Sequence, residues 1–317
     1  MKYFSMFSGV GGFELGIQQA YEDSRRTKQK ASIKSLQRLQ PNSSIGLGDG
    51  RESSATCIGY SEIDKYAIQV YKKHFPTHKN YGDCTKINAT ELPNFDFLVG
   101  GFPCQAFSIA GKRKGFDDTR GTLFFDIARI AKEKRPKYLL LENVKGLLSH
   151  DQGRTYKIIL STLAELHYDI RAMVLNSKNF GVPQNRERVF IAGCLGGWSG
   201  RKVFSFGRLA ETNKRKVKYK QFDMSGKGYN SQQDRLYDLE GIMGTLPNAN
   251  PDNKILLDTP RIRRLTPTEG ERLMGFPDQW TAEGTQGKIS DTQRYKMCGN
   301  AVTVNVVREI IKSFWEA

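Results

Sequence analysis

The chain has 317 residues, and its 49 lysines and arginines against 33 acidic residues give a formal net charge of +16. With 38% hydrophobic residues and no apolar run near the ~20 residues that span a bilayer, the composition excludes an integral membrane protein. We expect a soluble protein of the cytoplasm. Its positive charge indicates a polyanionic partner, because Lys and Arg neutralise phosphates and release counterions; a generally basic, solvated surface is the other interpretation.

Cysteine and histidine usage argues against a disulfide scaffold or a metal cluster. The five cysteines are odd in number, scattered, and form no C-x-x-C pair. The four histidines have no metal-ligand spacing. We therefore expect no bound metal.

Short apolar runs alternate with helical patterns over the first two-thirds of the chain. The predicted strands are Tyr3–Phe7, Thr56–Tyr60, Phe95–Val99, Tyr138–Leu141 and Val189–Ala192. Helical spacing relates Leu123 to Ala131, Ile159 to Leu166, and Val302 to Ile311. This alternation predicts an α/β fold, a mostly parallel sheet with helices on both faces, in which ligands bind beyond the carboxyl ends of the strands.

Two segments interrupt this alternation. Residues 22–55 are rich in Ser, Gln, Lys and Arg, which predicts an inserted surface loop; Ile33, Leu36 and Leu39 permit one short amphipathic helix within it. Residues 195–260 gain Gly, Asn and basic residues. We predict that this second segment forms a smaller, irregular or β-rich domain.

Three features near the predicted strand ends favour an adenosyl ligand without phosphates. Phe7–Gly12 is a glycine-rich turn that opens a helix, but Glu14 replaces the third glycine of the dinucleotide fingerprint. Glu62, with Asp64 close behind, suits the hydroxyls of a ribose, and Asp83 suits an adenine amino group. A generic turn and helix N-caps are the alternatives.

Gly100–Ser108 reads G-G-F-P-C-Q-A-F-S and places Cys104 in a bent loop after a predicted strand. A thiol held by backbone at a strand tip suits a nucleophile, although a buried structural cysteine fits the same segment. The following loop carries Gly hinges and four basic residues, Lys112, Arg113, Lys114 and Arg120, that could close over a phosphate backbone.

Glu142 ends the apolar run Tyr138–Leu141. Desolvation at that depth would raise the pKa of its carboxyl, which suits a group that carries a proton; a helix-capping role is the alternative. Arg186 and Arg188 flank Glu187 before another strand, a pattern that also fits a surface ion-pair ladder.

The order of these motifs closely resembles that of the DNA (cytosine-5)-methyltransferases. The matching blocks are FSGVGG, SEID, GDCTKI, GGFPCQAFS, GKRKGFDDTRGTLFFDIARI, LLLENVKG, QNRERVFIAG, RRLTPTEGERLMGFPD and YKMCGNAVTVNVV. They follow the family's order over nearly the whole chain. The resemblance implies a Rossmann-like methyltransferase domain of residues 1–193 and 293–317, and a target-recognition domain of residues 194–292.

The resemblance also implies the ligands and the role of each site residue. S-adenosylmethionine would bind to Phe7, Gly9, Val10, Gly11, Gly12, Glu62, Ile63, Asp83, Pro103, Leu123, Asn300 and Val302. Cys104 would attack C6 of a cytosine flipped out of duplex DNA. Glu142 would hold N3 and the amino group, Arg188 would bind O2, and Arg186 would support the site.

DNA contacts are expected from the basic loop and from the smaller domain, where Arg235 and Thr245 match the family's pattern. The resemblance further implies a monomer, with a cognate restriction endonuclease as a candidate partner. Transfer-RNA cytosine methylation is an alternative, but the Cys-Phe-Thr element of that branch is absent. A non-catalytic DNA-binding regulator is a second alternative, and a nicotinamide oxidoreductase is disfavoured by the glycine spacing. The DNA target sequence cannot be read from the chain.

Overall fold

The computed structural model describes residues 1–39, 55–103, 123–200, 203–204, 219–221, 235–238, 243, 254–256 and 262–315. A six-stranded sheet has the order β2-β1-β3-β4-β6-β5. Its strands are β1 (Lys2–Met6), β2 (Thr56–Ser61), β3 (Phe97–Gly101), β4 (Tyr138–Val144), β5 (Tyr168–Asn176) and β6 (Glu187–Leu195). The first four are mutually parallel, and β6 runs antiparallel to both of its neighbours. The α/β prediction is confirmed.

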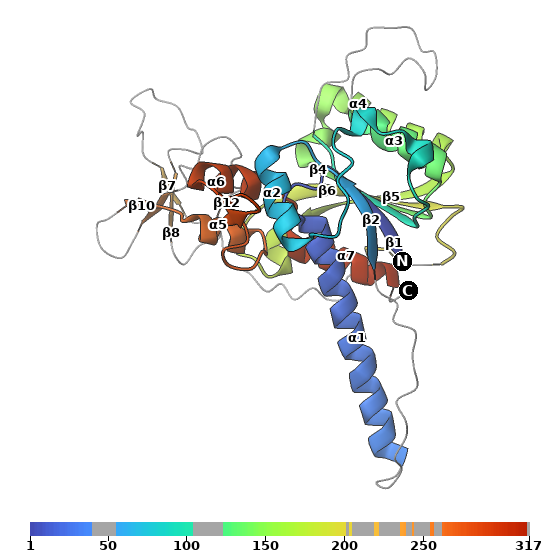
Figure 1. The fold of residues 1–317 in the computed structure, drawn as a ribbon, viewed down its shortest axis with the longest axis horizontal. Helices are drawn as coiled ribbons and strands as arrows, with labels where there is room; N and C mark the ends of the chain where they lie inside the picture. The colour runs from blue at the N-terminus through green and yellow to red at the C-terminus, as the bar shows by residue number, and fades with distance from the viewer. Residues whose placement is uncertain are drawn as a thin grey trace.

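Helices cover both faces of this sheet (Figure 1). On one face lie α3 (Leu123–Lys134) and α4 (Arg154–Glu165); on the other lie the start of α1 (Gly12–Leu39) and α7 (Val304–Trp315). Consecutive strand residues alternate between the two cores: Leu139 and Leu141 face the first, and Leu140 faces the second. A strand buried on both faces is apolar throughout, which is why these strands are visible in the sequence.

The strand β5 was not predicted. It forms one edge of the sheet, and β2 forms the other. Tyr168, Ile170 and Val174 alternate along β5 and pack on the first core, but the polar Asp169 and Arg171 stand between them. The short, mostly apolar runs by which the other strands were recognised are therefore interrupted here.

The expectation of a surface loop across residues 22–55 is wrong for its first half. The helix α1 continues without a break to Leu39 and projects beyond the sheet (Figure 1). Residues 22–39 contain no Gly or Pro and are rich in Gln, Lys and Arg, which favour helix, and the first proline is Pro41. Local propensity thus extends the helix beyond its packed part; residues 40–54 lie outside the described chain.

A smaller sheet of order β10-β9-β8-β7 lies apart from the large one (Figure 1). Its strands are β7 (Tyr219–Gln221), β8 (Arg235–Asp238), β9 (Lys254–Leu256) and β10 (Ile262–Arg264). The remaining elements are α2 (Lys65–His74), α5 (Pro267–Leu273), β11 (Glu283–Gly284), β12 (Gly287–Lys288) and α6 (Asp291–Asn300), with short 3₁₀ turns η1 (Cys84–Lys86), η2 (Ala89–Glu91), η4 (Lys145–Leu148), η5 (His150–Gly153) and η6 (Ser177–Phe180). This region is β-containing, as expected.

Residues after β10 return to the glycine-rich turn. A third core joins Leu273, Phe276 and Trp280 to Val10 of the turn and to Val70 of α2. The indole Nε1 of Trp280 donates a hydrogen bond to the carbonyl of Val10 at 2.9 Å. The boundary proposed at residue 292 stays a prediction, but this packing ties the preceding segment to the first helix and α2.

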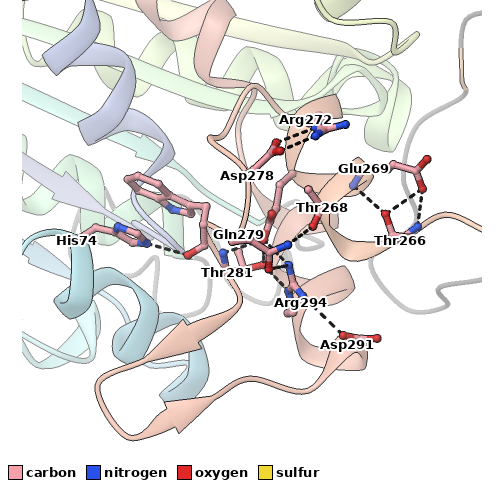
Figure 2. Close-up of polar contacts among 12 residues, drawn as sticks. His74, Thr266, Thr268, Glu269, Arg272, Asp278, Gln279, Thr281, Asp291 and Arg294 are labelled. Atoms are coloured by element: carbon pink, nitrogen blue, oxygen red, sulfur yellow. Dashed lines mark hydrogen bonds and ion pairs between the residues drawn. The ribbon is translucent and has the colours of Figure 1, made fainter.

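A buried polar network holds this returning segment together (Figure 2). Arg294 of α6 pairs with the fully buried Glu271 of α5 at 3.0 Å, and the same carboxyl oxygen accepts the backbone N–H of Thr281 at 2.8 Å. Thr266 and Glu269 cap α5 reciprocally. Among the helices described, none is long and apolar enough to cross a membrane.

Candidate active site

A cavity of about 460 Å³ opens at the carboxyl ends of the parallel strands. Its walls come from the residues directly after β1 and β2, from the ends of β3 and β4, and from α6. Because β6 is antiparallel, its beginning rather than its end reaches this edge, which brings Arg186 and Arg188 to the same place. The topology thus collects residues from six separate segments into one cavity.

Glu142 and Arg188 form an ion pair within the cavity. Arg188 of β6 lies opposite Val144 of β4. Glu142 stands two residues before Val144, so its side chain lies on the same face of the sheet as that of Arg188, and the two residues are diagonal neighbours. The Nε atom of Arg188 is 3.1 Å from Oε1 of Glu142, and both side chains are largely buried. Neither residue belongs to a surface ladder or a helix cap, the alternatives that the sequence left open.

Burial raises the pKa of Glu142 above its ordinary range, and the charges of Arg188 and Arg186 pull it part of the way back. A Cβ at Gly101 would lie 3.0 Å from Oε2 of Glu142, so the glycine leaves the carboxyl room to face the cavity. A carboxyl with a raised pKa beside a cavity can hold a proton and share it with a ligand.

Arg186 lines the cavity and also connects two segments of the chain by buried hydrogen bonds. Its Nη2 donates to the carbonyls of Gly299 and Ala301, each at 2.9 Å, and so fastens β6 to the end of α6. Its Nε and Nη1 are buried without a hydrogen-bond partner. Burial, with the neighbouring Arg188 charge, lowers the pKa of Arg186 to about 9, so it remains a cation at neutral pH.

The other half of the cavity is organised around Glu62. Its Oε2 accepts the backbone N–H of Gly9 at 2.8 Å, and its Oε1 accepts those of Ile63 and Asp64. These bonds join the turn after β1 to the turn after β2. Phe7, at φ 55°, lies in the left-handed region that L-residues rarely adopt, and it lines the cavity beside Gly9.

Predicted cofactor residues fall into two groups. Phe7, Gly9, Val10, Glu62, Pro103 and Asn300 line the cavity. The others do not: Gly11, Gly12, Ile63, Asp83, Leu123 and Val302. Gly11 and Gly12 instead pack against the protein core: a Cβ on Gly11 would collide with Phe75, and a Cβ on Gly12 would collide with Val302. The glycines therefore let the turn rest directly on the core.

Ile63 and Asp83 remain at the surface. Ile63 is 72% exposed, an unusual state for a large apolar side chain and one that leaves it free to pack on a planar ligand. Asp83 caps the turn η1 by accepting the backbone N–H of Thr85 at 3.0 Å. Leu123 begins α3 and packs at the edge of the first core.

Several predicted residues lie outside the described chain: Cys104, Lys112, Arg113, Lys114, Arg120 and Thr245. Arg235 begins β8, where the backbone alone is described.

Two polar features of the cavity were not predicted. Asn143 donates its side-chain N–H to the carbonyl of Phe102 at 2.9 Å and so fixes the chain leaving β3. Lys296 lines the cavity and pairs with Asp64 at 2.8 Å. Spacing offered a signal for Lys296, since it stands one helical turn before Asn300. Within the described ranges no group of three His, Cys, Asp or Glu could hold a metal ion.

The cavity fits an adenosyl ligand. A carboxylate at the end of β2, an exposed apolar side chain beside it and a close-packed glycine turn after β1 are what a ribose, an adenine ring and a methionine tail require. With a mostly parallel sheet covered on both faces, they define the class: a Rossmann-like, S-adenosylmethionine-dependent methyltransferase.

Comparison with known proteins narrows the class to a family. The sequence model of the family of C-5 cytosine-specific DNA methylases matches residues 1–241 and 201–316 of this chain. The chain is 37% identical to the Type II methyltransferase M1.ScrFI of Lactococcus lactis subsp. cremoris, over 99% of this chain and 78% of that protein. It is 33% identical to the Type II methyltransferase M.HhaI of Haemophilus parahaemolyticus, over 98% and 93%. The chain belongs to the C-5 cytosine-specific DNA methylase family.

The protein is thus a DNA (cytosine-5)-methyltransferase that uses S-adenosylmethionine as its methyl donor, as the motifs predicted. DNA is favoured over the transfer-RNA alternative by these relatives. The crystal structure of the S. pombe Dnmt2 methyltransferase has a TM-score of 0.71 at 19% identity and covers 100% of this chain and 98% of that one. This likeness shows a shared fold.

Proposed function

We propose that the cavity holds the methyl donor and a flipped cytosine side by side, and that Cys104, Glu142 and Arg188 carry out the chemistry. One observation supports this most strongly: the Glu142–Arg188 pair and the turn residues Phe7 and Glu62 line the same cavity. A base and a donor bound in these two halves would have their reacting atoms close together.

Cys104 directly follows Pro103, a residue of the cavity wall. C5 of a pyrimidine is a poor nucleophile until a group adds at C6, so the reaction needs covalent catalysis. In this proposal the Cys104 thiolate adds to C6, and the extra electron density makes C5 nucleophilic. Loss of the C5 proton after methylation then expels the thiolate.

Glu142 and Arg188 would stabilise the charge that develops on the ring. A protonated Glu142 can donate to N3 and accept from the amino group, and Arg188 can donate to O2. Their ion pair holds both groups at one end of the cavity before the base arrives. Arg186 would act indirectly, by fixing the β6–α6 junction on which Arg188 depends.

The donor supplies an electrophilic methyl group when bound. Glu62 would hold the ribose, Phe7 and Ile63 would enclose the adenine, and Asp83 would bind its amino group. The methionine portion would lie along Gly9, Val10, Gly11 and Gly12, with Pro103, Leu123, Asn300 and Val302 completing the pocket. The exposure of Ile63 and the Glu62–Gly9 bond support this assignment.

Duplex DNA would contact the basic loop Lys112, Arg113, Lys114 and Arg120, together with Arg235 and Thr245 of the target-recognition region. The net charge of +16 supports a phosphate-rich partner. Because the similar proteins are named as Type II methyltransferases of bacteria, we propose a role in a restriction-modification system beside a cognate endonuclease. The enzyme would act as a monomer on DNA in the bacterial cytosol.

Base-resolution mapping of 5-methylcytosine in a methylation-free host would identify the target site. A duplex with 5-fluorocytosine at that site should then trap the wild-type enzyme covalently, because fluorine cannot leave as the proton does. Cys104→Ser should form no adduct while still binding the donor. Cys57→Ser, at a half-buried thiol on β2, is the matched control. Equal trapping of the Cys104→Ser variant would refute the nucleophile assignment.

A further inference from the structure

An ion pair crosses the wall of the cavity and joins two elements far apart in the chain. Nζ of Lys296 on α6 lies 2.8 Å from Oδ2 of Asp64, which precedes α2, and both residues line the cavity. The Lys296 side chain is 47% exposed and that of Asp64 29%. Neither residue has a role in the chemistry proposed above.

Asp64 is held rigidly. Its Oδ1 accepts the backbone N–H groups of Tyr66 and Ala67, at 2.9 and 3.1 Å, and so caps α2. Its Oδ2 therefore has a fixed position, from which it holds the Lys296 ammonium. An ammonium has three N–H donors, and the Asp64 contact uses one of them. Lys296 can thus bind a second anion without leaving Asp64.

Two other described cations line the cavity, and both are engaged elsewhere. Arg188 pairs with Glu142, and Arg186 donates to the carbonyls of Gly299 and Ala301. Both arginines also lie close enough to Glu142 to lower its pKa, so the negative charge of the Glu142 carboxylate compensates their positive charges. Lys296 differs, because it faces the half of the cavity organised by Glu62 and Asp64.

The position of Lys296 on α6 also favours the donor half. Lys296 and Asn300 are four residues apart and therefore share a helix face, and both line the cavity. The methionine portion of the donor carries an α-carboxylate, which must find a cationic or N–H partner when it leaves water.

We infer that Lys296 binds the α-carboxylate of the S-adenosylmethionine methionine group and that Asp64 is the residue that positions it. This inference rests on the assignment of the cavity to the donor. A purely structural latch between α2 and α6 is the competing explanation, and it predicts a different binding pattern.

Decarboxylated S-adenosylmethionine separates the two explanations, because it lacks the carboxylate and keeps the rest of the donor. Dissociation constants of both compounds would be measured by calorimetry, without DNA and without turnover. The wild type should prefer the intact donor. Lys296→Met should weaken intact-donor binding by roughly 10- to 100-fold, the range of a charge-assisted hydrogen bond, and should change binding of the decarboxylated compound less than twofold.

Lys296→Arg should retain the preference, and Asp64→Asn should reduce it, because the ammonium loses its anchor. Lys65→Met is the control, since Lys65 begins α2 beside Asp64 but does not line the cavity. Equal weakening of both compounds by Lys296→Met, or no weakening of either, overturns the inference. If the wild type bound neither compound, the assignment of the cavity itself would fail, which is a separate outcome.

Discussion

Arg188 Nε lies 3.1 Å from Glu142 Oε1 across the antiparallel β4–β6 pair, so one contact both compensates a buried carboxyl and sets its affinity for a proton. Burial raises the pKa of Glu142, while Arg188 opposes that rise. A carboxyl with a raised pKa beside a cavity is suited to exchange a proton with a bound base. Because both residues lie on paired strands of the sheet, their ion pair is in place before any ligand binds.

Replacing Glu142 with Gln should slow methyl transfer at least ~100-fold, since acid–base assistance typically contributes that much. The amide keeps the shape of the side chain but can neither carry the proton nor form an ion pair with Arg188. Transfer of tritiated methyl groups into target DNA measures the rate. Donor affinity, measured separately, should stay within about twofold. A rate effect below twofold would remove Glu142 from the mechanism.

Replacing Arg188 with Met should destabilise the protein more at pH 8 than at pH 5. Without the arginine the pKa of Glu142 rises further above its unfolded value, so the native state loses more stability as the carboxyl ionises with increasing pH. Urea unfolding at the two pH values gives the difference. In the Glu142→Gln background the same substitution should show no such pH dependence, which makes the double variant the control. Equal destabilisation at both pH values would contradict the coupling.

Glu14, which does not line the cavity, predicts a second pH effect. It is buried in the first turn of α1, its Oε1 accepts the hydroxyl of Tyr71 at 3.0 Å, and its Oε2 has no hydrogen-bond partner. Burial raises the pKa of Glu14 from 4.5 to about 7. Because the folded pKa exceeds the unfolded one, its contribution to stability is complete below pH 4.5 and is lost as the pH rises to about 7.

That loss amounts to about 3 kcal/mol by linkage. Glu14→Gln should therefore flatten the dependence of unfolding free energy on pH across this interval, while the exposed Glu22→Gln should not. Denaturant titrations at several pH values would measure both slopes. A Glu14→Gln variant with the wild-type slope would show that this carboxyl is not the group responsible.

From the network in Figure 2 we expect that replacing Arg294 destabilises the protein much more than replacing Arg272 does. Arg294→Met should cost about 3–5 kcal/mol, because it leaves the fully buried Glu271 without its cation. Arg272→Met breaks the neighbouring but exposed pair with Asp278 and should have no measurable effect. Thermal unfolding of the two variants tests this contrast. Comparable losses in both would mean that burial does not govern these pairs.

Five strands and the chemistry at their ends could be predicted, because most of their residues are apolar and a polar residue directly after such a run is conspicuous. Glu142 and Glu62 were found in this way. The strand β5 could not be found, because Asp169 and Arg171 interrupt its apolar residues. Its edge position is not the reason, since β2 forms the other edge and was predicted. The length of α1 does not follow from polarity, because the polar composition of residues 22–39 fits a surface loop as well as an exposed helix; the absence of Gly and Pro from these residues is what favours the helix.

Contacts between distant segments were the part that the sequence did not reveal. Nothing local indicates that Lys296 reaches Asp64, or that Arg186 fastens β6 to the end of α6. Such pairs depend on how the last helices return to the first strands. Cys104 is a different case: its loop was the strongest local signal, and it lies outside the described residues, so its role stays a prediction.

Residues 262–304 pack against the glycine-rich turn Phe7–Gly12, and this packing has a consequence for synthesis in the cell. Asn300 and Lys296 line the same cavity as Phe7 and Glu62. During synthesis the cavity walls contributed by β1 and β2 therefore stay incomplete until α6 has been translated. A nascent polypeptide that stops before α6 lacks part of the site proposed for the methyl donor.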